Sequence, residues 1–261
     1  MVSTIVDTTF DVSVADAYRS PSQRARCLTE DWFSRNGYCP ACPSDTVVRT
    51  ANNAKAVDFL CTSCGAEYQL KSKAGVIAGK VRDAAYAPMC ERVLAGTAPH
   101  FALLRYDRVQ LTVRDLLFVP SHFITLDALE QCRPLAATAR RAGWVGCNLL
   151  LHALPPDAMV AAISGGNAVE RATVRRQWAR FSWLAGGAAE ARGWVAEVLQ
   201  CVRRIGDRRF TLAEMYAFEE HLARRHPSNQ NVRPKIRQQL QVLRDQGILR
   251  FLGHGIYEPV P

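Results

Sequence analysis

The sequence lacks any run of about 18 apolar residues, so we expect no membrane-spanning helix. Glycine and proline are scarce, at 16 and 13 of 261 residues, while hydrophobic residues make up 48% of the chain. This composition excludes a fibrous or intrinsically disordered protein, because enough apolar side chains are present to offset the entropy lost on ordering. A 29.0 kDa chain can form one large domain or two small ones.

Acidic residues are also in deficit. The 24 Asp and Glu residues face 33 Lys and Arg, which gives a net charge of +9. A basic excess favours a polyanionic partner, although charge governs association and not fold. The N-terminal segment lacks the basic region, apolar stretch and cleavage site of a signal peptide. Since the cysteine count, nine, is odd, we expect a cytoplasmic protein without a disulfide framework.

Four of the nine cysteines form two closely spaced pairs. Two residues separate Cys39 from Cys42 and Cys61 from Cys64, and 18 residues lie between the pairs. This spacing predicts a structural zinc ribbon with a closed, tetrahedral Cys₄ site that leaves no open position for chemistry. Two redox motifs, or incidental cysteines, are the alternative. The other cysteines lie among apolar residues and are expected to be buried: Cys27, Cys90, Cys132, Cys147 and Cys201.

Two stretches that flank the second cysteine pair alternate as half-buried strands do. They are residues 56–60 and residues 67–73, and a hairpin between them would bring Asp58 beside Gln69 and Lys71. This D-x10-Q-x-K array resembles the D…(D/E)-x-K site of restriction-endonuclease-like nucleases. The resemblance implies that Asp58 and Gln69 hold a divalent metal and that Lys71 orients or activates the attacking water. An exposed strand face with polar side chains is the alternative.

The last 80 residues have a different pattern, which begins with a Gly- and Ala-rich stretch at 182–192 that suits a linker. Residues 193–205 have one apolar helical face. Thr211 and Glu214 form a capping box that predicts a helix over 212–225.

A third helix is predicted from about Arg233, with Pro234 in its first turn. A hairpin that turns at 253–255 follows it. Three helices and a hairpin in this order predict a winged helix-turn-helix domain. The middle of the chain is less informative, apart from a buried strand expected at 101–106.

In a winged helix-turn-helix the third helix enters the major groove and the wing contacts the DNA backbone. Arg and Lys side chains suit guanine edges or phosphates, and glutamine suits adenine. The candidate DNA contacts of this domain are Arg233, Lys235, Arg237, Gln238 and, in the wing, His254. Gln239 lies nearer the apolar stripe and is expected to be partly in the core. A solvated face in a protein-binding module is the alternative.

A second candidate DNA contact is the segment that contains Arg140, Arg141 and Trp144. The arginines could contact phosphates, and the indole could supply an apolar surface for a methyl group. A core tryptophan is the alternative. One methyl group in an apolar pocket is worth about 1–3 kcal/mol, so stronger selection needs several such contacts.

Sequence blocks over nearly the whole chain resemble the Dam-replacing family of DpnI-like, methyl-directed restriction endonucleases. Besides the two cysteine pairs, the blocks are, in chain order, Ser22–Arg26, Leu28–Trp32, Ala56–Phe59, Leu70–Lys73, Arg133–Ala136, Thr138–Asn148, Arg192–Trp194, Phe210–Leu212 and Lys235–Asp245. Their common order makes the resemblance far more specific than any single motif.

The resemblance implies an α+β protein of two domains. Residues 1–181 would form a restriction-endonuclease-like α/β core with an inserted zinc ribbon, and residues 182–261 a winged-helix DNA-binding domain. The implied activity is Mg²⁺-dependent double-strand cleavage of DNA at GATC sites that carry N6-methyladenine. We expect a monomer in solution.

One position departs from the family pattern, which has Glu where this sequence has Gln69. An amide oxygen can coordinate Mg²⁺ but brings no charge. Glu67, on the same strand face, or Glu30, from the first helix, could supply the charge, or they could be ordinary solvated acids. Three functions therefore remain open: an active methyl-directed endonuclease, a non-cleaving methyl-dependent DNA-binding protein with a decayed nuclease site, and an interaction scaffold.

Overall fold

A seven-stranded sheet organises the first part of the chain in the computed structural model, which describes residues 6–51 and 57–260. Its strands are, in spatial order, β1 (Val48–Arg49), β2 (Phe59–Leu60), β3 (Glu67–Ala74), β5 (His100–Asp107), β6 (Thr112–Val119), β9 (Val160–Ser164) and β10 (Asn167–Ala168). Strands β3 and β5 are parallel, and the other neighbours are antiparallel. The strand expected at 101–106 is confirmed as β5.

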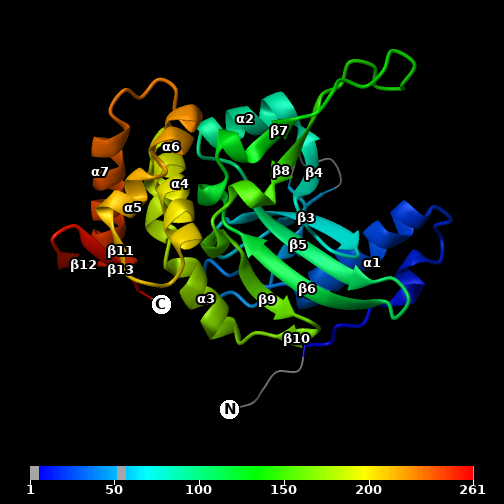
Figure 1. The fold of residues 1–261 in the computed structure, drawn as a ribbon. Helices are drawn as coiled ribbons and strands as arrows, with labels where there is room; N and C mark the ends of the chain where they lie inside the picture. Colours follow the sequence, from blue (N-terminus) through cyan, green and yellow to red (C-terminus); the bar gives the residue numbers. More distant parts are fainter. Residues whose placement is uncertain (1–5, 52–56, 261) are drawn as a thin grey trace.

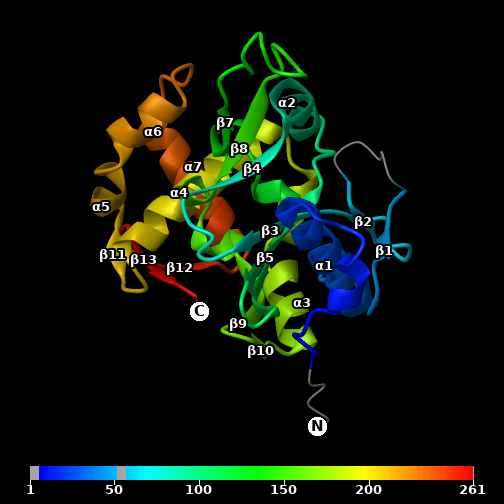
Figure 2. The ribbon, with the colours of Figure 1, turned by 90° about the vertical axis from the view of Figure 1, so that its right-hand side faces the viewer.

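The sheet has a hydrophobic core on each face, because successive strand residues point to opposite sides. In β5, Ala102 and Leu104 enter one core while Phe101 and Leu103 enter the other. Helices α1 (Pro21–Asn36) and α3 (Arg171–Ala179) pack into the first, here named the ribbon-side core. Helices α2 (Tyr86–Leu94) and α4 (Ala189–Ile205) pack into the second, the module-side core, and Figures 1 and 2 show the two layers.

A second, three-stranded sheet lies beside the first, with the order β4 (Lys80–Ala85), β8 (Gly146–Leu150) and β7 (Leu129–Gln131). Residues 132–145 join β7 to β8 as a long loop that projects from the body of the molecule (Figures 1 and 2). Short 3₁₀ helices complete this part: Val12–Ala15, Ser121–Phe123, Leu126–Ala128, Leu151–Ala153, Pro156–Ala158 and Ser182–Gly186.

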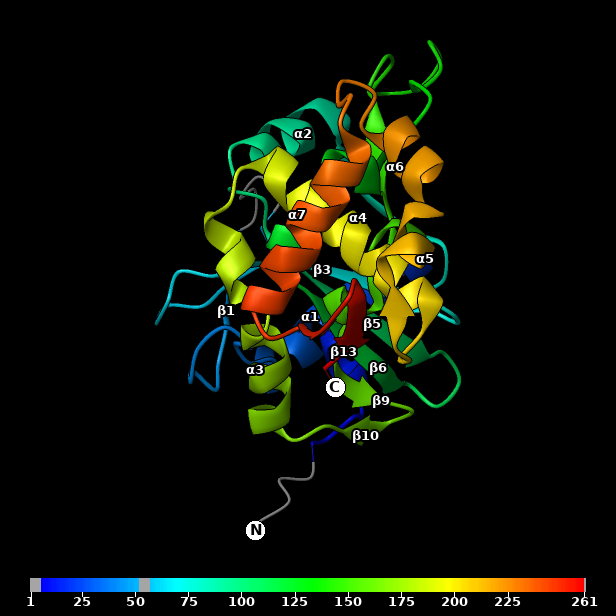
Figure 3. The same ribbon diagram turned by 60° about the vertical axis from the view of Figure 1, so that its left-hand side comes forward.

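The C-terminal module combines helices with a small sheet, as predicted (Figure 3). After α4 come β11 (Phe210–Thr211), α5 (Leu212–Tyr216), α6 (Glu219–Arg225), α7 (Val232–Asp245), β12 (Leu249–Gly253) and β13 (Ile256–Pro259). Thr211 and Glu214 form the predicted capping box, and the β12–β13 hairpin turns around His254. Ile236, Leu240 and Leu243 of α7 are buried in the module-side core.

Three expectations about the elements were wrong in detail. The helix predicted over 212–225 is broken, because the N–H groups of Ala217 and Phe218 bond to carbonyls only three residues back and end α5. The stretch 182–192 is largely helical and is held by the buried Arg192, which donates to the Val93 and Gly187 carbonyls. Of the strand expected at 56–60, only Phe59–Leu60 is a strand, and Ala56 lies outside the described residues.

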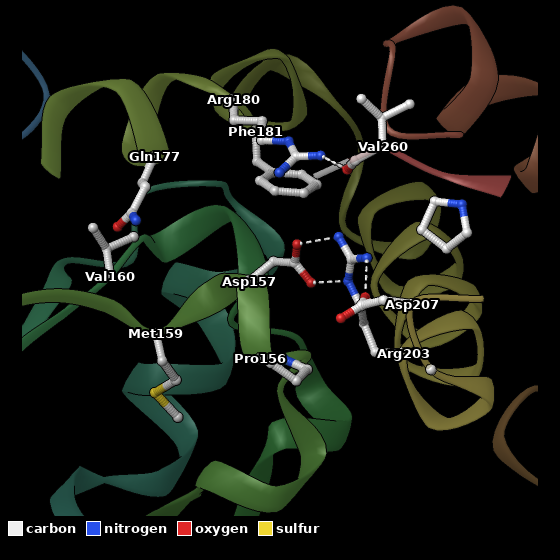
Figure 4. Close-up of a pocket in the computed structure, with 12 residues that line it drawn as sticks. Pro156, Asp157, Met159, Val160, Gln177, Arg180, Phe181, Arg203, Asp207 and Val260 are labelled. Carbon is white, nitrogen blue, oxygen red and sulfur yellow. Dashed lines mark hydrogen bonds and ion pairs between the residues drawn. The ribbon is translucent and has the colours of Figure 1, made fainter. Parts of the chain in front are cut away.

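The module is fixed to the first part of the chain by more than the shared core. Arg203 of α4 forms a bidentate pair with Asp157, at 2.7 and 2.8 Å, and both side chains are largely buried. Arg180 of α3 donates to the Val260 carbonyl near the C-terminus. These contacts border a cavity of about 570 Å³ at the junction (Figure 4). None of the helices in the described part of the chain is long and apolar enough to span a membrane.

Candidate functional site

The four paired cysteines come together as predicted. Their sulfur atoms all lie within 4.8 Å of one another, and the Cys39–Cys64 and Cys42–Cys61 Sγ pairs are each 3.6 Å apart. A tetrahedron of thiolates around zinc, with bonds of about 2.3 Å, has edges of roughly 3.8 Å, so the cluster is compatible with structural zinc.

The four thiols differ in environment: burial raises the pKa values of Cys39 and Cys64, whereas that of Cys61 is lowered, and one contact anchors the cluster to the sheet. Burial opposes ionisation of Cys61, but the N–H groups of Cys64 and Ser63 outweigh it and lower the pKa of the Cys61 thiol to about 6. The hydroxyl group of Tyr68, a buried residue of β3, lies 3.0 Å from Cys39 Sγ. The cysteine cluster is thereby attached to the strand that carries Gln69 and Lys71.

The other cysteines are less uniformly buried than expected. Cys147 and Cys201 are buried, as predicted, but Cys27, Cys90 and Cys132 are only partly covered. The prediction was wrong for these three because apolar neighbours in sequence do not place a residue on the inner side of an element. Cys132, for example, begins the projecting loop.

Asp58 lies at the edge of β3, next to Gln69. The Asp58 N–H donates to the Tyr68 carbonyl at 2.9 Å, and Asp58 Oδ2 accepts from the Leu70 N–H at 2.8 Å. Burial raises the pKa of Asp58, while the Leu70 hydrogen bond and the charge of Lys71 act in the opposite direction. The carboxylate is therefore largely desolvated but keeps polar neighbours that favour its charged form.

Gln69 is buried, with 5% of its surface exposed, and its Oε1 has no hydrogen-bond partner among the described residues. A buried amide oxygen without a partner is costly and needs an explanation. Gln69 lies on the same face of β3 as Lys71 and opposite Asp58. An electropositive ligand at this point would therefore provide the missing partner for the amide oxygen.

Lys71 has a partner that the sequence interpretation missed. Its Nζ lies 2.9 Å from Oδ1 of Asp83, a fully buried carboxylate on β4, and 5.9 Å from the centre of the Phe101 ring. The other carboxylate oxygen of Asp83 lies 3.8 Å from Cys147 Sγ on β8. A signal was present: Asp83 follows Val81 on the inner face of β4, and a buried acid needs a cationic or hydrogen-bonding partner.

The two additional acids that could supply charge to the site are both paired with guanidinium groups. Glu30 is buried on α1 and pairs with Arg26, at 2.6 Å, and with Arg49. Glu67 pairs with Arg92 of α2 and is 41% exposed. The charge of Glu30 raises the pKa of the Asp58 carboxyl group, so Glu30 is the acid of the two that interacts electrostatically with Asp58.

The projecting loop carries Arg140 and Arg141 as exposed side chains. The Arg141 guanidinium stacks over the Trp144 ring, 4.5 Å from its centre. The indole is half-buried and lies so close to Gly146 that a Cβ at residue 146 would come within 2.8 Å of the ring. Trp144 is thus neither a core residue nor a free side chain, but one layer of a small stack.

The candidate side chains of α7 differ in how available they are. Arg233 pairs with Glu219 at 2.7 Å and lies over the Tyr216 ring, while Lys235 leans towards the buried Trp194. Arg237 and Gln238 are exposed, and Gln239 is buried, as expected. At the wing tip, His254 has a positive φ of 47° between two glycines and is also exposed.

The observations so far define a mixed α+β protein with a large sheet, a candidate metal site of four cysteines and a C-terminal helix-turn-helix module. The chain belongs to the Dam-replacing family: residues 6–186 match the DpnI, Dam-replacing family model, and residues 190–259 match the Dam-replacing helix-turn-helix domain. The resemblance inferred from the sequence is confirmed. Membership indicates a nuclease of the methyl-dependent restriction type, and the helix-turn-helix module indicates DNA binding.

Proposed function

We propose that this protein is a type II, methyl-directed restriction endonuclease that makes double-strand breaks in DNA at GATC sites carrying N6-methyladenine. The observation that carries the proposal is the buried, unpartnered oxygen of Gln69 next to the desolvated carboxylate of Asp58, in a chain of the Dam-replacing family. The proposal includes a restriction-endonuclease-like core in which the seven-stranded sheet supports the site.

The donor set fits a hard cation such as Mg²⁺, because it offers one anionic and one neutral oxygen and no sulfur. Asp58 and Gln69 would hold the ion. When bound, Mg²⁺ supplies a Lewis acid that offsets negative charge on the reacting phosphate. The absence of charge on Gln69 predicts a weaker metal site than a pair of carboxylates would give.

Lys71 is the residue proposed to face the scissile phosphate and the attacking water. The buried Asp83 carboxylate holds its Nζ at 2.9 Å, which restricts a long and otherwise mobile side chain to one region of the site. Its ammonium group would orient a water molecule whose oxygen bonds to phosphorus as a bridging P–O bond of the backbone breaks.

DNA recognition is proposed to involve two surfaces. Arg237 and Gln238 of α7, with the wing at His254, would contact the duplex from the C-terminal module. Arg140 and the Arg141–Trp144 stack would contact it from the projecting loop. Arg233 and Lys235, which are engaged by Glu219 and Trp194, would reach phosphates only by leaving these contacts.

A second candidate function, a non-cleaving methyl-dependent DNA-binding protein, is favoured by one observation: the family's glutamate is replaced by Gln69. In that case the module and the loop would bind DNA while metal affinity at Asp58 is too low for turnover.

Cleavage of plasmid DNA with full, hemi or no adenine methylation, in the presence of Mg²⁺, tests the proposal. We expect discrete GATC fragments from methylated DNA only, and none with Lys71→Ala. Glu67→Gln is the matched control. Glu67 lies on the same face of β3 as Lys71, but it is paired with Arg92 of α2 and should be dispensable for cleavage. Equal cleavage of all three substrates would exclude methyl direction.

The second function is tested in the same assay with Gln69→Glu. If the wild-type protein shifts methylated duplexes in a gel but leaves the plasmid intact, and Gln69→Glu cleaves it, the site has decayed at this position. If both proteins cleave, Gln69 is compatible with turnover and the second function is excluded. The division of the chain into residues 1–181 and 182–261, the monomeric state and the cytoplasmic location stay predictions.

A further inference from the structure

A groove between β3 and β4 extends the candidate site from Lys71 and contains none of the DNA contacts proposed above. It encloses about 430 Å³ and is lined by residues of β3, β4 and β8. Four cationic side chains line it, two from each of the first two strands: Lys71, Lys73, Lys80 and Arg82. Ser72 on β3 and Asn148 on β8 are the neutral polar residues of this lining.

The charges in the groove are only partly compensated. Lys71 is paired with Asp83, and Lys80 is paired with Glu130 at 2.8 Å. Glu130 also accepts a hydrogen bond from Asn148 at 2.6 Å. Lys73 and Arg82, by contrast, are exposed and form no ion pair with any described residue. The groove therefore keeps an excess positive charge next to the candidate nuclease site.

The cations form two rows and not one cluster. Lys71 and Lys73 share one face of β3, about 7 Å apart by strand rise, and Lys80 and Arg82 are spaced in the same way on β4. A small anion would need one convergent point of charge. Rows with this spacing match a polymer whose charges repeat at a similar distance, such as the backbone of a nucleic-acid strand.

We propose that this groove binds the sugar–phosphate backbone of the DNA strand to be cut, with Lys73 and Arg82 contacting the phosphate next to the one that faces Lys71. The inference rests on the proposed function for the identity of the polymer and of the scissile phosphate. Glu130 should weaken DNA binding in the groove, because its carboxylate neutralises Lys80 at the edge of the groove.

Binding without cleavage tests this groove. The dissociation constant of a methylated GATC duplex is measured without added Mg²⁺ and without a chelator, over a range of salt concentrations. Each lost phosphate contact should reduce the slope of log K against log[salt] by about 0.9, so Lys73→Ala combined with Arg82→Ala, which removes the contact to one phosphate, should reduce it by about that amount. Glu130→Gln should act in the opposite direction and tighten binding.

Arg176→Ala is the matched control, since Arg176 is an exposed arginine on α3, which packs into the core on the other face of the sheet. It should leave affinity and slope unchanged. The series is repeated in an Arg237→Ala, Gln238→Ala background, so that contacts from the C-terminal module do not mask the groove. Circular dichroism checks that every variant is folded.

The outcomes separate this inference from the proposed function. A reduced slope in either background supports the groove, even if the protein never cleaves the plasmid. Unchanged slopes in both backgrounds overturn the groove alone and leave cleavage as a separate result. Failure of the wild-type protein to bind any duplex overturns both.

Discussion

The two faces of the seven-stranded sheet are stabilised in different ways. On one face, the ribbon-side core includes Cys39 and Cys61 of the four-cysteine cluster, and the Tyr68 hydroxyl group contacts Cys39. On the other, the module-side core is apolar and continuous with the C-terminal helices. Adjacent residues of β3 serve both faces: Tyr68 contacts the cluster, while Gln69 and Lys71 face the opposite side. The strand that carries the candidate site is therefore anchored, through Tyr68, to the four-cysteine cluster.

The strongest test of this difference removes the metal from one face. Cys61→Ala removes one of the four candidate ligands and should abolish zinc binding. It should also destabilise this face, because structural zinc contributes on the order of 10–16 kcal/mol to folding. We expect hydrogen exchange to accelerate in α1 and β3, with the loss of any cleavage, while α4 and α7 remain protected. Zinc content by atomic absorption and exchange by mass spectrometry measure both effects.

Cys201→Ala provides the control for that experiment, since Cys201 is a buried cysteine of the module-side core. It should keep a full zinc content and lose only a little stability. A normal melting curve and unchanged zinc content in Cys61→Ala would show that the four-cysteine assignment is wrong.

A smaller effect is expected where the module meets the sheet. Arg203→Met leaves Asp157 buried without its partner, and breaking one side of such a pair typically costs about 3–5 kcal/mol. Urea unfolding of this variant should show the loss. Adding Asp157→Leu should restore much of it, because the uncompensated charge is then gone.

Arg204→Met tests whether the effect belongs to the pair, because Arg204 is the exposed neighbour of Arg203 and should cost less than about 0.5 kcal/mol. Equal losses for the two arginines would mean that the Arg203–Asp157 contact does not fix the module to the sheet.

The smallest expected effect is a pH dependence near the boundary of the two cores. His100 and His122 line one cavity, where burial lowers the pKa of His100 to about 4 and that of His122 to about 3. In the unfolded chain both titrate near 6.5, so the unfolded state takes up protons first as the pH falls. Stability present above pH 6.5 should decline as the pH drops towards 4.

His122→Gln should make that decline shallower, and the free energy of unfolding in urea between pH 7.5 and 5, with zinc in excess, measures it. The exposed His152, changed to Gln, is the control and should follow the wild-type curve. If the free energy of unfolding falls with pH equally in His122→Gln and in the wild-type protein, His122 is not the cause of the decline.

Local patterns in the sequence predicted the parts of the molecule that depend on short spacing. The cysteine spacing indicated the metal cluster, and the capping box at Thr211 with the turn at 253–255 indicated the C-terminal module. The break at Phe218 was not predictable, because the apolar periodicity continues through the i+3 hydrogen bonds of Ala217 and Phe218 that end α5. Asp83 alternates with Val81 as a buried acid would, but its partner was missed because the Lys71 contact depends on β4 lying near β3, which no local pattern encodes.

The Lys71–Asp83 contact also has a consequence for the order of events during synthesis. Asp58, Gln69 and Lys71 lie within one hairpin, but the β4 strand that carries Asp83 pairs only with β8, which ends at Leu150. We therefore expect a nascent chain that stops short of residue 146 to contain the proposed metal ligands and Lys71 but to lack the strand pairing that places Asp83 beside Lys71. A nuclease assembled in this way gains its full site late, after more than half of the chain has left the ribosome.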